Sequence, residues 1–175
     1  MRHLLLIGEH DLGIDDKNRL SLPADIRKQI NSDRDGDAFF LVLGRNGKPW
    51  LYPEKYYEQM VFQEEPEITP EEEQLDFDHM NFALADRITW DSQGRMLIPE
   101  KTMRRTGLGK EITMIGSRDH LELWDRAEWQ VRREGLLARR TEVAIRAKKI
   151  RRNPPSEGSN GNGPQGPAGP VGDQG

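Results

Sequence analysis

Residues 15–23 have the sequence DDKNRLSLP, and residues 91–99 have the sequence DSQGRMLIP. Both contain Asp, a variable residue, Lys or Gln, Asn or Gly, and Arg, followed by an apolar-x-apolar step and Pro. An internal repeat of this kind indicates a protein built from two copies of one small unit. Each copy also places an Arg, Arg19 or Arg95, beside the residues of a tight turn. The repeat therefore bears on function as well as on fold.

The similarity between the two copies extends beyond this motif. Residues 41–44 (LVLG) correspond to residues 113–116 (TMIG), and residues 51–56 correspond to 123–128. The offset between the copies is 76 residues at the motif and 72 at the later glycines, so the first copy has a loop four residues longer. Loops tolerate such insertions. Each copy is predicted to contain strand, turn, strand, short helix, strand, turn and strand.

Turn residues and apolar runs predict where these elements lie. Proline suits the first turn of a helix, glycine ends one, and a short continuous apolar run indicates a buried strand. The first copy is expected to contain strands at 5–12, 19–22, 39–43 and 50–52 and a helix from Pro23 to about residue 30. The second is expected to contain strands at 87–90, 95–98, 111–115 and 121–124 and a helix from Pro99 to Gly107. The fold class is therefore α+β, mainly β.

Charge is distributed unevenly along the 175 residues, whose net charge is -4. Residues 64–78 contain eight Asp or Glu and no Lys or Arg, and Thr69 as N-cap with Pro70 predicts a helix to about residue 85. Residues 131–152 carry nine Lys or Arg against two Glu and are also expected to be helical. The net charges of residues 1–130, 131–152 and 153–175 are -9, +7 and -2. A basic segment behind an acidic body suggests a polyanionic or acidic partner.

Composition changes along the chain predict five segments. Two repeat units are expected at 1–62 and 86–130, separated by an acidic helical linker at 63–85. A basic helix at 131–152 and a disordered Gly/Pro-rich tail at 153–175 follow. The tail contains collagen-like triplets, but too few for a stable triple helix.

Several classes of site are not expected. The chain has no cysteine, which excludes disulfides and thiol nucleophiles and fits a reducing cytoplasm. Its four histidines show no metal-ligand spacing, and residues 107–110 (GLGK) lack the full phosphate-loop spacing. The apolar run near the start is only four residues long, too short for a signal-peptide core or a membrane span. We therefore expect no catalytic site, metal, cofactor, small-molecule substrate or membrane partner, and no enzyme activity.

These residues resemble the MraZ family, bacterial transcriptional regulators made of two tandem AbrB/SpoVT-type units. The family motif is Asp-x-Lys-Gly-Arg in the first unit and Asp-x-Gln-Gly-Arg in the second, each followed by an apolar step and Pro. This sequence matches over about residues 7–130, through Asp15, Lys17, Arg19, Pro23, Asp91, Gln93, Gly94, Arg95 and Pro99. It departs from the motif at Asn18, where the first unit normally has Gly. Asn is the next best residue for a positive φ, so the turn should be preserved.

The resemblance implies a fold, an assembly and a function. The fold is an intrachain pseudo-dimeric β-barrel of swapped hairpins with flanking helices, and the assembly is a ring-shaped homo-oligomer. The function is sequence-specific binding to double-stranded DNA upstream of a cell-division and cell-wall operon that includes the protein's own gene, usually as repression. Because the body is acidic, a ring that holds several weak recognition surfaces at fixed spacing predicts promoter direct repeats as the target. A cytoplasmic, nucleoid-associated protein is expected.

The chemistry of the motif suits DNA recognition. The planar guanidinium group of Arg matches the O6 and N7 acceptors of guanine in the major groove. The expected DNA-binding residues are Arg19, Lys17, Arg95, Asn18, Gln93 and Arg27. Asp15, Asp91 and Gly94 are expected to shape the turns, since Asp accepts local backbone N–H groups.

Two other interpretations remain open. An Arg beside a turn is often a solvated surface residue or half of a weak ion pair. The second interpretation is an AbrB-like assembly or antitoxin-type protein whose main partner is another protein.

Overall fold

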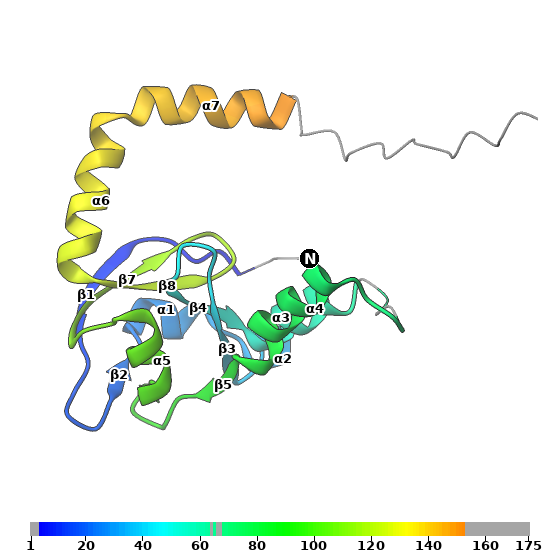
Figure 1. Ribbon diagram of the computed structural model, residues 1–175. Helices are drawn as coiled ribbons and strands as arrows, with labels where there is room; N and C mark the ends of the chain where they lie inside the picture. The colour runs from blue at the N-terminus through cyan, green and yellow to red at the C-terminus, as the bar shows by residue number, and fades with distance from the viewer. Residues whose placement is uncertain (1–3, 64, 66–67, 153–175) are drawn as a thin grey trace, which may run out of the picture. The chain divides into compact units, whose positions relative to one another are not determined.

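The computed structural model describes residues 4–63, 65 and 68–152 (Figure 1). The chain divides into two units, residues 1–133 and 134–175, each of which is described by itself. The first copy contains β1 (Glu9–Gly13), β2 (Arg19–Ser21), α1 (Ala24–Gln29), α2 (Ser32–Asp35), β3 (Ala38–Leu43), β4 (Pro49–Pro53) and α3 (Glu54–Val61). α4 (Glu72–Asp78) and a π-helix, η1 (His79–Ala83), lie between the copies. The second copy contains β5 (Asp86–Thr89), β6 (Arg95–Leu97), α5 (Glu100–Thr106), β7 (Glu111–Gly116) and β8 (Leu121–Asp125), and α6 (Arg126–Ala138) and α7 (Arg140–Arg152) follow.

The strands form a six-stranded antiparallel sheet and a separate two-stranded ribbon. The sheet has the order β1-β7-β8-β4-β3-β5, and the ribbon pairs β2 with β6. Exchanging the copies leaves this order unchanged, so the topology has approximate two-fold symmetry. The first strand of each copy pairs with the other copy, β1 with β7 and β5 with β3. This arrangement confirms an α+β fold that is mainly sheet, with β1 and β5 at the edges of the sheet.

One hydrophobic core is shared by both copies. It contains Leu20, Ile26, Phe39, Leu41 and Leu51 from the first and Ile88, Met96, Ile98, Ile112, Met114, Leu121 and Leu123 from the second. Burying apolar surface is the main favourable contribution to folding. Since neither copy encloses this core alone, the two copies should fold together as a single body.

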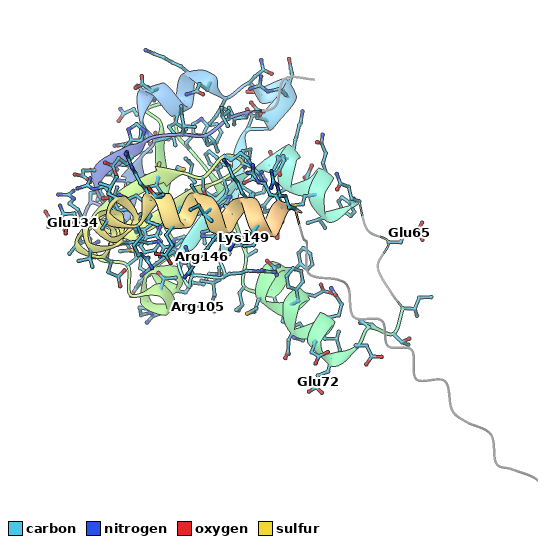
Figure 2. The ribbon with its side chains drawn as sticks, turned by 90° about the horizontal axis from the view of Figure 1, so that it is seen from above. Glu65, Glu72, Arg105, Glu134, Arg146 and Lys149 are labelled. Carbon is cyan, nitrogen blue, oxygen red and sulfur yellow. The ribbon has the colours of Figure 1, made fainter. Side chains whose placement is uncertain are left out.

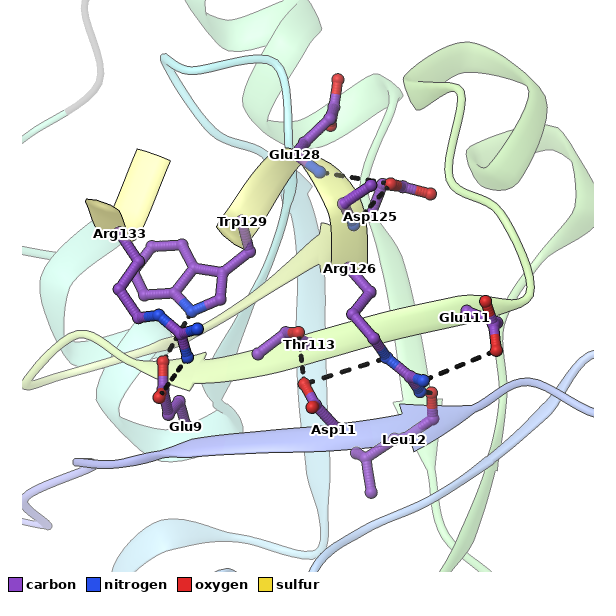
Figure 3. Close-up of polar contacts among 11 residues, drawn as sticks. Glu9, Asp11, Leu12, Glu111, Thr113, Asp125, Arg126, Glu128, Trp129 and Arg133 are labelled. Carbon is purple, nitrogen blue, oxygen red and sulfur yellow. Dashed lines mark hydrogen bonds and ion pairs between the residues drawn. The ribbon is translucent and has the colours of Figure 1, made fainter. Parts of the chain in front are cut away.

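A cluster of contacts fixes the start of α6 against the edge strand β1 (Figure 3). Arg126 donates from Nη2 to the carbonyl of Leu12 at 2.9 Å. Further along α6, Trp129 Nε1 and Arg133 Nη1 donate to the two carboxylate oxygens of Glu9 at 2.7 and 2.8 Å. The predicted boundary between residues 130 and 131 therefore falls inside a continuous helix.

Some predicted elements differ from the structure. The polar run after α1 contains the short helix α2, whose N-cap Asn31 accepts the N–H of Arg34 at 2.9 Å, and α3 was not predicted. The acidic helix begins at Glu72 with Glu71 as N-cap, so the prediction of Thr69 as N-cap is wrong. The basic segment is divided at Arg139 into α6 and α7. The predicted tail, 153–175, lies outside the described residues. None of the helices described has the length and apolar composition needed to span a bilayer.

His120 is buried where the two copies meet. It is buried immediately before β8, with Nδ1 2.7 Å from Asp119 Oδ1 and Nε2 a longer 3.5 Å from Glu122 Oε1. Its ring stacks on Trp50 from the first copy, with centroids 4.2 Å apart. Burial opposes protonation, but the two carboxylates outweigh it and raise the pKa of His120. His120 therefore lies between two carboxylates, a setting that the spacing of the histidines in the sequence did not indicate.

Candidate nucleic-acid interface

The first motif forms a tight turn organised by Asp15. Its Oδ1 accepts the backbone N–H groups of Lys17 and Arg19, both at 2.9 Å. Its Oδ2 accepts from Nε and Nη2 of Arg19, both at 2.8 Å. One carboxylate therefore shapes the backbone and orients the arginine side chain at the same time.

The second motif repeats this geometry. Asp91 Oδ1 accepts the N–H groups of Gln93 and Arg95 at 2.9 and 3.0 Å. Its Oδ2 accepts from Nε and Nη2 of Arg95 at 2.8 Å in each case. The repeat in sequence is thus a repeat in hydrogen bonding.

Both aspartates are held in the ionised form. The side-chain hydrogen bond from Arg19, followed by its backbone N–H, lowers the pKa of Asp15 to about 2. For Asp91, the backbone N–H of Arg95 and then its side chain lower the pKa. Each Asp–Arg pair is consequently ionised, with no net charge, at neutral pH.

The fourth residue of each turn adopts a left-handed backbone, but the two turns are supported differently. Asn18 has φ 58° and Gly94 has φ 77°. The side-chain Oδ1 of Asn18 accepts from Lys110 Nζ at 2.8 Å, and the same ammonium group donates to the carbonyl of Asp15 at 2.9 Å. At Gly94, a Cβ atom would lie 2.2 Å from Nη1 of Arg27, so this guanidinium occupies the space beside the glycine. Lys110 was missed because its only sequence context was an incomplete phosphate-loop pattern.

The ribbon brings the two motifs together. Arg19 pairs with Leu97, Leu20 with Met96 and Ser21 with Arg95. Neighbouring side chains on a strand point to opposite faces, and Leu20 and Met96 are fully buried. Arg19 and Arg95 therefore share the outer face as diagonal neighbours, whose Cα atoms are typically about 7–8 Å apart.

The remaining predicted residues lie around this face. Lys17 and Gln93 are exposed in the two turns, and Arg27 extends from α1. The side chains of Arg19 and Arg95 are 35% and 33% exposed, so each guanidinium is reachable despite its bond to Asp. The ribbon register thus places Arg19 and Arg95 on one face, together with Leu97, which is 61% exposed.

A family model described as "MraZ protein, putative antitoxin-like" matches residues 5–78 and 81–148. The chain belongs to the MraZ family. The two matched segments each begin just before the first strand of a copy, so the MraZ repeat coincides with the structural repeat.

Individual MraZ relatives give the same result. The protein from Clostridium tetani is 30% identical over 128 residues, which cover 72% of this chain and 85% of the relative. The protein from Spiroplasma kunkelii is 31% identical over 135 residues, covering 73% and 87%. The protein from Neisseria meningitidis serogroup A is 31% identical over 124 residues, covering 70% and 82%. Each is named a transcriptional regulator, which is not a class of enzyme.

Proposed function

We propose that this chain is a sequence-specific DNA-binding transcriptional regulator that recognises its operator through the β2–β6 ribbon. The observation that carries this proposal is the pair of Asp-oriented guanidinium groups of Arg19 and Arg95 on one exposed face. A two-stranded ribbon has the dimensions to enter a major groove.

The Asp–Arg bonds determine which part of each guanidinium can meet a base. An Arg side chain has five N–H donors, and the aspartate takes the Nε donor and one on Nη2. The donors at the far end of the fork, on Nη1 and Nη2, are not taken by the aspartate. These two suit O6 and N7 of guanine, a contact that contributes about 1–3 kcal/mol of discrimination. The aspartates thus act by orienting arginine before DNA arrives.

The other residues have complementary roles. Lys17 suits a phosphate or a guanine, and Gln93 suits the N6 and N7 atoms of adenine. Arg27 lies beside the second turn, where it would meet a backbone phosphate. Asn18 uses its Oδ1 on Lys110, which leaves its Nδ2 group to donate to DNA.

Assembly would compensate for a small recognition surface. Residues 1–130 have a net charge of -9, so one protomer alone is poorly suited to bind a polyanion. A ring of protomers engaging promoter direct repeats would gain affinity through effective concentration. We include in the proposal a pseudo-dimeric barrel of swapped hairpins, supported by the cross-copy strand pairing. We also include repression of a cell-division and cell-wall operon containing the chain's own gene, in the cytoplasm at the nucleoid.

A second candidate, an assembly or antitoxin-type protein, is favoured by the linker surface. The side chains of Phe77, Met80 and Phe82 are each about half exposed on the acidic α4–η1 segment. Such apolar exposure often marks a site for another protein.

The test compares wild type with Arg19→Ala and Arg95→Ala on a duplex taken from upstream of the gene. Arg45→Ala, in the turn after β3, is the matched control because it removes an arginine at the end of the sheet opposite the motif. Each motif variant should lose about 1–3 kcal/mol of discrimination between this duplex and a scrambled one, while Arg45→Ala retains it. Equal binding to both duplexes by the wild type would reject sequence-specific recognition and favour the protein-partner candidate.

A further inference from the structure

The helix α7 carries a charge that the proposed recognition surface does not use. It contains six cations and one anion, and all thirteen of its residues are exposed. Its cations are Arg140, Arg146, Lys148, Lys149, Arg151 and Arg152. The anion, Glu142, is bonded to Arg146 at 2.5 Å. Figure 2 shows Arg146 and Lys149 extending from this helix.

The ribbon itself supplies little net positive charge. Arg19 and Arg95 are each paired with an ionised aspartate, and Asp16 lies beside Lys17. Binding to DNA gains much of its affinity from cations that neutralise phosphates and release counterions. Arg27 and Lys110 add two cations near the ribbon, but residues 1–130 have a net charge of -9, so cations from α7 would add affinity for DNA.

We propose that α7 binds the phosphate backbone of double-stranded DNA without sequence preference. This inference rests on the proposed function only in taking DNA as the partner of the chain. α7 is about 20 Å long at 1.5 Å per residue, which corresponds to about six base pairs at 3.4 Å. Five of the six cations fall within residues 146–152, about 10 Å of helix at 1.5 Å per residue. The same length of duplex carries about six phosphates on its two strands.

The distribution of side chains favours DNA over a membrane surface. A helix that binds a membrane surface needs one continuous apolar face. Here Val143 and Ile150 lie on one side, whereas Ile145 lies on nearly the opposite side, because successive residues differ by about 100°. Lys148 and Lys149 likewise point to different sides. Cations on several sides suit a groove flanked by two rows of phosphates.

The test measures the salt dependence of binding to two duplexes of about 40 base pairs, one from upstream of the gene and one of mixed sequence. Lys148→Gln/Lys149→Gln removes two cations and retains helix-forming residues. Arg45→Gln/Arg118→Gln is the matched control, with the same change in net charge. Arg45 and Arg118 lie in the turns that follow β3 and β7. These turns are at the far ends of the two strands from the motifs, because the motifs follow β5 and β1 beside the first residues of β3 and β7.

Binding weakens as salt increases, and the α7 variant should make this dependence less steep on both duplexes. The magnitude of the slope of log K against log salt should fall by about 0.9 for each lost phosphate contact, hence by about 1.8. The ratio of affinities for the two duplexes should stay unchanged, and the control should keep the wild-type slope. An equal change in both variants, or no change in either, overturns the proposal for α7. A loss of slope in the α7 variant, with no preference between duplexes in the wild type, supports α7 and rejects sequence-specific recognition.

Discussion

Replacing Gly94 with Ala tests whether the position of Arg27 beside the second turn matters for DNA binding. A Cβ atom at this position would lie 2.2 Å from Nη1, 3.0 Å from Cζ and 3.1 Å from Cδ of Arg27. These contacts are too short to persist, so the arginine side chain must move. Because the side chain is exposed and flexible, this movement should cost little stability.

The substitution also has a backbone cost, which can be measured separately. Gly94 has φ +77°, and an L-residue in this left-handed region costs about 1–2 kcal/mol. Gly47 has φ +73° with nothing near its Cβ position, so Gly47→Ala carries the same backbone cost without displacing a side chain. Both variants should lower Tm by about 2–8 °C, since 1 kcal/mol corresponds to about 2–4 °C for a chain of this size.

DNA binding should separate the two variants. If Arg27 contacts a phosphate, Gly94→Ala should weaken binding about tenfold, since a hydrogen bond to a charged group contributes about 1.5 kcal/mol and 1.4 kcal/mol is a factor of ten. Gly47→Ala should bind as wild type does. On an Arg27→Ala background, Gly94→Ala should cause no further loss. The reasoning is refuted if both glycine variants bind equally, or if Gly94→Ala weakens Arg27→Ala as much as it weakens the wild type.

Three further predictions concern the surroundings of the ribbon. Leu20→Ala should lower the free energy of unfolding by about 2–5 kcal/mol, whereas Leu97→Ala, on the exposed face, should change it by less than about 0.5 kcal/mol; denaturant titration checks both. Lys110→Met should weaken the first turn more than Asn18→Gly, because it removes the bonds to both the Asn18 side chain and the Asp15 carbonyl. Adding Asn18→Gly to Lys110→Met should cause no further loss, because the bond between the two side chains is already broken. Folding raises the pKa of His120. The stabilisation that this group gives the folded state is therefore complete below about pH 6.5, the pKa of histidine in the unfolded chain, and declines as the pH rises through the higher pKa of the folded state. His120→Gln should remove this decline in the free energy of unfolding above pH 6.5. If the variant shows the same dependence of unfolding free energy on pH as the wild type, the assignment to His120 is wrong.

The motif predicted the turns and the strands on either side of them because their signals are local. An Asp that caps its own turn, a Pro that opens a helix and alternating apolar residues all act within a few positions. The left-handed backbone at Asn18 was predictable for the same reason.

Contacts between distant parts of the chain carried no such signal. Lys110 is 92 residues from Asn18, and nothing near either residue indicates the bond between them. The pairing of β1 with β7 was equally hidden. The equivalent strand β3, in the same copy as β1, has a similar apolar sequence, so the sequence does not show which of the two pairs with β1. The stacking of Trp50 on His120 was hidden too, because Trp50 comes from the other copy.

The differences between the two turns bear on the kind of operator expected. An exactly symmetric ribbon would present identical ends and would suit a palindrome, since operator symmetry mirrors protein symmetry. Here one turn presents Lys17 and Asn18 and the other presents Gln93 and Gly94, with Lys110 supporting the first and Arg27 beside the second. A ribbon with unlike ends has a direction on DNA. In the proposed ring, protomers related by rotation would all keep the same direction, which would suit the direct repeats of that proposal.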